Sequence, residues 1–259
     1  MTAMPDWTRR FSLEGRKALV TGASKGIGAE ICAVFADAGA DVVAVARDAA
    51  GLAQTAARVR DKGRRCLTIA ADLATADGPV AAGREALAQW GAIDILVNSA
   101  GVALVAPALD LTLAQWDTTM AVNLRAPFLL AQTLAPAMIA QGHGKIINIS
   151  SQTGVIALDD HAAYATSKGG LNALTKSLCA EWARHNVQVN AICPTVILTP
   201  MGREVWGPEE KSAPMIAATP ARRFGEPVEV ADMALYLAGP ASDLVNGAIL
   251  MIEGGYSSV

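Results

Sequence analysis

Short runs of consecutive apolar residues recur along the chain, separated by longer segments in which apolar residues repeat at helical spacing. The short runs are rich in valine, isoleucine and leucine, which is typical of strands that are buried on both faces of a sheet. Seven runs are predicted to be strands: residues 17–23, 41–47, 65–71, 93–101, 144–151, 187–194 and 247–255.

The intervening segments, such as 29–39 and 113–142, are rich in alanine and have the helical period. Strands that alternate with helices form βαβ units, and such units build a parallel sheet. We therefore predict an α/β fold, a Rossmann-type doubly wound parallel sheet of about seven strands with helices on both faces. No repeat or linker divides the chain, so residues 1–259 should form a single domain.

The segment at about 195–226 differs from its surroundings, because it contains several prolines and little clean periodicity between two predicted strands. A long irregular connection inside a compact domain is more often a functional lid than a spacer. We expect this segment to cover a substrate.

The amino-acid composition and charge indicate a globular protein and argue against binding to nucleic acid or to a membrane. Apolar residues make up 52% of the chain and aromatic residues 5%, which suits a large aliphatic core. The net charge of −3, with no cationic run longer than a pair, argues against nucleic acid as a partner. The four cysteines are scattered singly, and no signal peptide or membrane-length apolar run is present. The predicted location is cytoplasmic, with no membrane partner.

A glycine-rich loop follows the first predicted strand and opens the first predicted helix, in "VTGASKGIGAE". Glycine allows a tight turn and a close approach of the backbone to a pyrophosphate, which the helix N-terminus attracts with its free N–H groups. We predict that this loop binds a dinucleotide through Gly22, Ser24, Lys25, Gly26, Ile27 and Gly28.

The end of the second predicted strand should select the dinucleotide. An acid there would bind the adenosine ribose, whereas a cation would bind a 2′-phosphate. This strand ends in Ala46 and Arg47, and Lys25 adds a second cation, so NADP(H) is the preferred cofactor and NAD(H) remains possible. The alternative is that Arg47 is a solvated surface charge and that Asp48 is the ribose ligand or a helix N-cap.

Tyr164 and Lys168 are four residues apart in a predicted helix, so they should project from one face. An ammonium stabilises phenolate over phenol, which would lower the pKa of Tyr164 and suit it for general acid/base catalysis. Spacing alone also fits an ordinary amphipathic pair. Ser151 ends a predicted strand thirteen positions earlier, at the edge where open α/β sheets bind their ligands.

Together with the glycine loop, "NSAG" at 98–101 and "VN" at 122–123, these residues resemble the single-domain short-chain dehydrogenase/reductase family. "CPTVILTPMG", "GVALVAPALDLT" and "SSQTG" are similar to its L-xylulose/dicarbonyl reductase branch, although the family's usual Pro-Gly is Pro194-Thr195 here. The resemblance implies a catalytic tetrad. Ser151 would bind the carbonyl oxygen, Tyr164 would exchange its proton, Lys168 would assist Tyr164 and hold the nicotinamide ribose, and Asn123 would maintain a water relay.

The resemblance also implies further cofactor contacts and a homotetramer. Asp72 would contact the adenine. The remaining contacts would be Asn98, Ala100 and Gly101 beside the adenine ribose, and Pro194, Val196 and Thr199 at the nicotinamide end.

For the substrate we predict contacts with Gln152, His161 and Trp206, and no metal site. For His161, a structural hydrogen bond is an open alternative. For Gln152 and His161 together, the alternative is that they only brace the loop ahead of Tyr164. The predicted function is an NADPH-preferring carbonyl reductase or secondary-alcohol dehydrogenase of small polar ketones such as ketoses, polyols or vicinal diketones. The alternatives are a 3-oxoacyl-thioester reductase and a non-catalytic dinucleotide-binding regulator.

Overall fold

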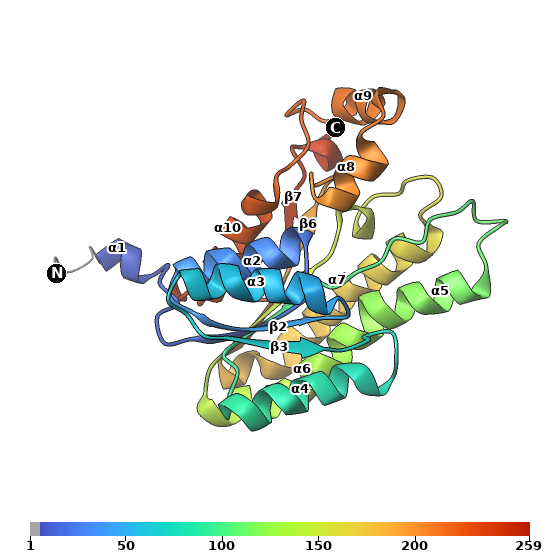
Figure 1. Cartoon of the computed structure of the whole chain (residues 1–259). Coiled ribbons are helices and arrows are strands. Elements are labelled where there is room, and N and C mark those ends of the chain that lie inside the picture. Colours follow the sequence, from blue (N-terminus) through green and yellow to red (C-terminus); the bar gives the residue numbers. More distant parts are fainter. Residues whose placement is uncertain (1–5) are drawn as a thin grey trace.

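The computed structural model describes residues 6–259, and its centre is a seven-stranded parallel sheet (Figure 1). The strand order is β3-β2-β1-β4-β5-β6-β7, so the chain winds outward from β1 to one edge and then from β4 to the other. The strands are β1 (Lys17–Thr21), β2 (Asp41–Ala46), β3 (Cys66–Ala70), β4 (Ile95–Asn98), β5 (Gly144–Ile149), β6 (Val187–Pro194) and β7 (Ile249–Ile252). The predicted doubly wound α/β fold is confirmed.

Helices cover both faces of the sheet. The helices are α1 (Asp6–Arg9), α2 (Gly26–Asp37), α3 (Ala49–Asp61), α4 (Asp77–Trp90), α5 (Leu113–Met120), α6 (Ala126–Gln141), α7 (Ala162–Trp182), α8 (Pro200–Trp206), α9 (Glu209–Ala218) and α10 (Pro227–Ala238). The helices α2, α3 and α10 pack on one face, and α4, α6 and α7 pack on the other (Figure 1).

The strands read as unbroken apolar runs because both of their faces are buried. In β1, Ala18 and Val20 belong to the core under α2 and α10, whereas Leu19 belongs to the core under α4 and α6. Every residue of β2 and β6 is buried. Side chains that alternate between two apolar layers produce this pattern in a parallel sheet.

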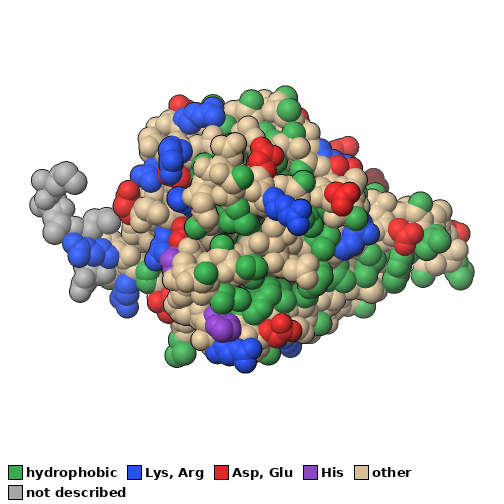
Figure 2. All heavy atoms as spheres, turned by 90° about the horizontal axis from the view of Figure 1, so that it is seen from below, with side chains coloured by type: hydrophobic (Ala, Val, Ile, Leu, Met, Phe, Trp, Pro, Cys, Tyr) green, Lys and Arg blue, Asp and Glu red, His purple; other side chains and the backbone are tan. Residues whose placement is uncertain are grey.

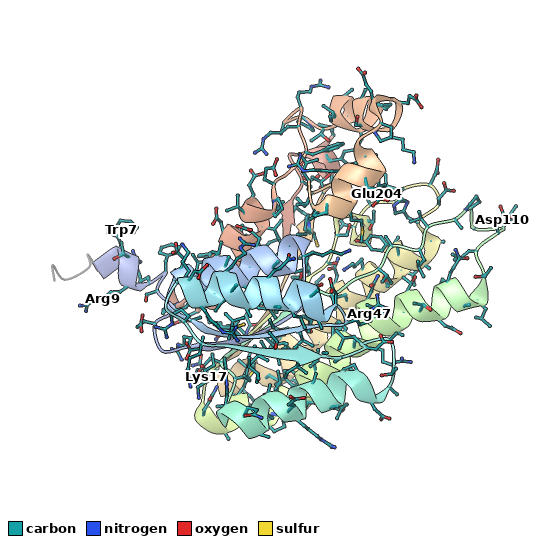
Figure 3. All side chains as sticks on the ribbon, in the orientation of Figure 1. Trp7, Arg9, Lys17, Arg47, Asp110 and Glu204 are labelled. Carbon is teal, nitrogen blue, oxygen red and sulfur yellow. The ribbon has the colours of Figure 1, made fainter. Side chains whose placement is uncertain are left out.

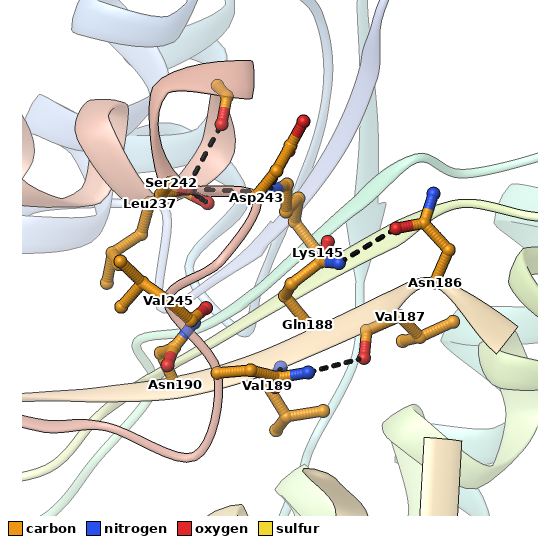
Figure 4. A network of polar contacts seen from close by, with 12 residues as sticks. Lys145, Asn186, Val187, Gln188, Val189, Asn190, Leu237, Ser242, Asp243 and Val245 are labelled. Carbon is orange, nitrogen blue, oxygen red and sulfur yellow. Dashed lines mark hydrogen bonds and ion pairs between the residues drawn. The ribbon is translucent and has the colours of Figure 1, made fainter. Parts of the chain in front are cut away.

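Polar contacts fix the amino-terminal edge of β5 and β6 (Figure 4). Lys145 forms an ion pair with Asp243 at 2.7 Å, and the Gln188 amide donates to Asn186 Oδ1 at 3.0 Å. The Asn190 amide donates to the Val245 carbonyl at 2.8 Å. These contacts join the loop before β7 to the sheet at the edge opposite the carboxyl ends of the strands.

The predicted helix over 113–142 is divided, because a π-helical turn at Ala121–Arg125 separates α5 from α6. Pro127 has no N–H to donate to the carbonyl of residue 123, so one hydrogen bond of a regular α-helix is missing there. Instead, the Ala126 N–H donates to the Ala121 carbonyl five residues earlier. Such turns are frequent at functional sites, and this one contains Asn123.

The segment 195–226 is more regular than predicted, since it contains α8 and α9 above the ends of β6 and β7 (Figure 1). Pro200 occupies the first turn of α8, where its missing N–H costs nothing. Thr199 caps α8 by accepting a hydrogen bond from Gly202 N at 3.0 Å. Prolines at the starts of α8 and α9 interrupt the pattern of apolar residues, so this pattern did not predict the two helices.

Hydrophobic side chains gather on the face that carries α4 and α6 (Figure 2). A shallow apolar depression between the π-helical turn, α6 and α7 is lined by Met120, Leu124, Phe128 and Leu174. A homo-oligomer could cover such a surface, but the homotetramer stays a prediction. In residues 6–259, no helix combines the length and the apolar character needed to span a bilayer.

Candidate active site

A cleft of about 470 Å³ lies at the carboxyl ends of β1, β2, β3 and β4. Its walls come from the glycine loop, the residues after β2 and β3, the turn after β4 and the start of α8. The strand order reverses between β1 and β4, and open α/β sheets bind ligands outside this reversal point.

The glycine loop forms a close-fitting cradle at one end of this cleft. Gly22 has φ +66°, and a Cβ there would lie 2.8 Å from Ala100 Cα. A Cβ on Gly28 would lie 2.4 Å from the Gly22 carbonyl oxygen, so α2 can approach the strand only with glycine at this position. Lys25, the N-cap of α2, provides no side-chain hydrogen bond. The first N–H groups of α2 therefore remain available, as binding of a pyrophosphate requires.

Two cations border the same cleft. Lys25 and Arg47 are both exposed, and neither side chain has a hydrogen bond or ion pair with another described residue; Figure 3 shows Arg47 beside the start of α3. Asp48 is occupied differently, because its Oδ1 accepts hydrogen bonds from Ala50 N and Gly51 N, each at 3.1 Å. Asp48 is thus the N-cap of α3, one of the roles that the sequence left open.

The structure brings most of the predicted cofactor residues into the cleft wall. All six residues of the glycine loop line it, and so do Arg47, Asp72, Ala100, Gly101 and Thr199. Asn98, Pro194 and Val196 do not line it, and neither do Tyr164 and Lys168, which were also predicted to contact the cofactor. Asn98 is buried, and its amide donates to Asn148 Oδ1 at 2.9 Å, so its side chain braces β4 against β5 and does not face the cleft.

Sequence reasoning missed Thr21, whose side chain shapes the turn after β4. Thr21 Oγ1 accepts hydrogen bonds from Ser99 N at 3.0 Å and from Ala100 N at 3.1 Å. These two N–H groups fix the turn that contacts Gly22. A threonine at the end of a buried strand is too common to be singled out from sequence alone.

The four predicted catalytic residues assemble beside this cleft. Ser151 follows β5, and its side chain interacts with Tyr164 on the first turn of α7 and lowers the pKa of that phenol. Lys168 Nζ lies 5.6 Å from the centroid of the Tyr164 ring and donates to the Ile149 carbonyl at 2.7 Å. Tyr164 and Lys168 therefore share one face of α7, as their spacing predicts.

Asn123 holds its place through three hydrogen bonds. Its Oδ1 accepts from Val102 N at 2.9 Å, and its Nδ2 donates to the Val102 carbonyl at 2.9 Å and to Ser167 Oγ at 3.0 Å. Ser167 Oγ in turn donates to the Tyr164 carbonyl at 2.7 Å. The π-helical turn is thereby joined to the turn of α7 that carries Tyr164.

The electrostatics differ from the sequence-based expectation. Burial raises the pKa of the Tyr164 phenol, and the hydrogen bond with Ser151 only partly opposes this shift. The same burial lowers the pKa of Lys168 to about 8. Burial therefore sets the direction of this shift, and the effect of Lys168 on the pKa of Tyr164 stays a prediction. Tyr164 keeps its proton at neutral pH, as a general acid requires.

A buried thiol, which sequence reasoning assigned only to the core, faces the same group of residues. Cys193 at the end of β6 contacts the Ser150 side chain and the Ser151 main-chain N–H, and it donates to Asn172 Oδ1 at 3.7 Å. Burial raises the pKa of Cys193, so it stays a neutral thiol. Among the described residues, no cluster of three or more His, Cys, Asp or Glu side chains could hold a metal ion.

The predicted substrate residues have different surroundings. His161 is half-buried, and its ring stands edge-on to the Tyr164 ring with centroids 6.0 Å apart. Its Nδ1 also forms a 2.5 Å hydrogen bond with the Asp159 carbonyl, so it has both the position of a substrate contact and the structural bond that was the alternative. Trp206 packs edge-on against Phe224, with ring centroids 5.9 Å apart.

Gln152 departs from the expectation of an open substrate wall. Its residue is 2% exposed, and its Oε1 is buried without a hydrogen-bond partner. A buried and unpaired amide oxygen is costly. The structure places Gln152 beneath the surface, next to Ser151.

Known proteins resemble this chain over almost its whole length. The sequence model of a family described as enoyl-(acyl carrier protein) reductase matches residues 22–257. D-threitol dehydrogenase from Mycolicibacterium smegmatis is 44% identical over 248 residues, which are 95% of this chain and 95% of that protein. L-xylulose reductase from Mus musculus is 40% identical over 250 residues, covering 95% of this chain and 98% of that protein.

Solved structures agree with the fold. The crystal structure of a gluconate 5-dehydrogenase from Burkholderia cenocepacia, in complex with NADP and tartrate, superposes with a TM-score of 0.93. It is 40% identical in sequence, and the match covers 98% of this chain and 99% of that one.

Proposed function

The chain belongs to the short-chain dehydrogenase/reductase family of NAD(P)-dependent oxidoreductases, and we propose that it is an NADPH-preferring reductase of small polyhydroxy ketones. The reverse reaction would oxidise the matching polyols. The observation that carries this proposal is the assembly of Asn123, Ser151, Tyr164 and Lys168 beside the dinucleotide cleft. A regulator that only bound the dinucleotide would not need these four side chains together.

The dinucleotide fits the cleft in three respects. The glycine cradle and the uncapped start of α2 suit its pyrophosphate, and Lys25 and Arg47 suit a 2′-phosphate on its adenosine ribose. The exposed Asp72 lies in the cleft wall where it can meet the adenine. When bound, the dinucleotide supplies or accepts the hydride.

The side chains around the reacting carbon handle the carbonyl oxygen. Ser151 donates a hydrogen bond to this oxygen, and Tyr164 transfers its phenolic proton to the same oxygen as negative charge develops there. Lys168 is cationic below about pH 8, so it stabilises the phenolate left behind and can hold the nicotinamide ribose. Asn123 keeps the π-helical turn joined to the carbonyl of Tyr164 through Ser167. In the direction of alcohol oxidation the same proton transfers run backwards.

Two observations support small polyhydroxy ketones as the substrate class. Relatives that are 36% to 44% identical to this chain carry the names of polyol, sugar or sugar-acid enzymes. The matching family model is described by a different activity, enoyl-(acyl carrier protein) reduction. His161 also presents a ring beside Tyr164 whose Nε2 has no hydrogen bond with another described residue. A site that bonds hydroxyl groups rejects analogues that lack them, because its polar groups are then left unpaired.

We therefore expect L-xylulose to have a higher kcat/KM with NADPH than an acetoacetyl thioester or a bulky aryl ketone, by at least about ten-fold. Steady-state kinetics on these three substrates measures this. His161→Ala should reduce the preference for the ketose, whereas His185→Ala, remote from the site on the turn before β6, should not. A preference for the thioester would replace the proposed substrate class by that of a 3-oxoacyl-thioester reductase.

A further inference from the structure

The hydroxyl of Ser151 is held by the residue two positions after it. Ser151 Oγ lies 3.2 Å from the main-chain nitrogen of Thr153 and 3.0 Å from Thr153 Oγ1. Both residues are buried, 8% and 5% exposed, and the short 3-10 turn Gln152–Gly154 fixes their relative position. Ser151 is the N-cap of this turn.

The number of hydrogen bonds that a hydroxyl can form fixes the direction of each one here. A serine oxygen can accept two hydrogen bonds and donate one. The Thr153 N–H can only donate, so it fills one acceptor position. The Thr153 hydroxyl has no hydrogen-bond partner other than Ser151 within residues 6–259, so its proton fills the second. The single proton of Ser151 is then left to be donated away from Thr153.

Among the described residues, the side chain that can receive this proton is that of Tyr164, the proposed proton donor of the reaction. The Ser151 side chain lowers the pKa of the Tyr164 phenol, as a donor to the phenolic oxygen does. With its two acceptor positions filled, Ser151 can act only as a donor toward Tyr164. The phenolic proton of Tyr164 is then free to be donated to another acceptor. The donors thus run in one direction, from Thr153 to Ser151 and from Ser151 toward Tyr164.

We propose that Thr153 is a positioning residue whose hydroxyl orients the Ser151 proton toward the oxygen atoms that react. This role rests on the proposed function, in which Ser151 donates to the substrate carbonyl oxygen. A Ser151 proton that already points toward Tyr164 has only to pass from the phenolic oxygen to the neighbouring carbonyl oxygen when the substrate binds. Little reorientation is then left for the chemical step, and such preorganisation accelerates it. Without the Thr153 hydroxyl, Ser151 could turn its proton toward other acceptors.

The groups that titrate near this pair come from two elements. Lys168 and His161 lie on or beside α7 and face Tyr164, and Cys193 on β6 faces Ser151. The hydrogen bond from Ser151 lowers the pKa of Tyr164 against the effect of burial. Loss of the Thr153 hydroxyl should weaken this bond, so the pKa of Tyr164 should rise.

Thr153→Val tests the proposal, because valine preserves the shape and burial of the side chain and removes only its hydroxyl. We expect kcat for ketose reduction to fall about ten-fold, as loss of one such hydrogen bond implies. NADPH affinity, measured by fluorescence titration, should be unchanged. The pH at which polyol oxidation reaches half its alkaline maximum should move upward. Thr153→Ser, which restores the hydroxyl, should recover both kcat and the pH profile.

The parallel variant Ser151→Ala separates failure of this inference from failure of the proposed function. If Ser151→Ala retains turnover, the proposed role of Ser151 is wrong, and the role of Thr153 is wrong with it. If Ser151→Ala loses turnover but Thr153→Val has the kcat and pH profile of the wild type, the inference about Thr153 alone is overturned. If Thr153→Val does not fold, Thr153→Ser still tests the inference about Thr153, because serine keeps the hydroxyl. A folded Thr153→Ser variant with reduced kcat would overturn that inference.

Discussion

Tyr164→Phe should lower kcat for ketone reduction by at least about 10²-fold, the contribution typical of a general acid. The substitution keeps the aromatic ring, which is packed among buried residues of α7 and beside His161, and removes only the acidic proton. Stopped-flow or steady-state oxidation of NADPH in the presence of a ketose measures the loss. NADPH binding should persist, because the cradle of Gly22 and Gly28 is unchanged.

Tyr236→Phe is the matched control. Tyr236 belongs to α10, where its ring packs 6.4 Å from that of Phe11, outside the cleft wall. Removal of its hydroxyl should leave kcat near that of the wild type. A Tyr164→Phe variant with near-normal turnover would remove this tyrosine from the mechanism.

Cofactor preference should reverse when the charge at the end of β2 is reversed. In the double variant Ala46→Asp and Arg47→Ser, the ratio of kcat/KM for NADPH to that for NADH should fall by about 10²-fold or more. One charge-assisted hydrogen bond to phosphate, worth about 1.5–3 kcal/mol, is lost, and a carboxylate that repels phosphate is gained. The same carboxylate can pair with the ribose hydroxyls of NADH.

Kinetics with both cofactors test this expectation in the wild type and in the variant. Arg47→Ser alone should shift the ratio in the same direction, which covers the case in which a carboxylate at the buried Ala46 disturbs folding. Arg84→Gln, which removes an exposed cation from α4 on the opposite face of the sheet, should leave the ratio unchanged. A wild-type enzyme with the higher kcat/KM for NADH would contradict the assignment of Arg47 to the 2′-phosphate.

The sheet was predictable because burial on both faces leaves a direct mark on the sequence. The predicted strands 41–47 and 187–194 agree with β2 and β6 to within one residue at each end. The helices α8 and α9 in the segment 195–226 were not predictable from periodicity, since prolines at their starts and their short length interrupt it. The π-helical turn has one local signal in the sequence, Pro127.

The site divides in a similar way. The glycine loop, Tyr164 and Lys168 were predictable because each performs its chemistry at a fixed spacing within one element. The raised pKa of Tyr164 was not, since it depends on burial by elements distant in the sequence. Asn98 lies outside the cleft wall because its amide bonds to Asn148 on the neighbouring strand, a contact between β4 and β5 that the sequence does not show. The sequence shows that Thr153 has a hydroxyl two residues after Ser151. It does not show that both side chains are buried and hydrogen-bonded to each other.

A hydride that passes from the nicotinamide to the carbonyl of a ketose carries its label to one carbon of the polyol. Mass spectrometry of the polyol formed from L-xylulose, with NADPH deuterated at both hydrogens of the nicotinamide C4, detects this transfer. We expect one deuterium per product molecule, attached to the carbon that was the carbonyl, and loss of this transfer in Tyr164→Phe. A product without deuterium at that carbon, or no product from any ketose while an acetoacetyl thioester is reduced, would show that the proposed reaction is wrong.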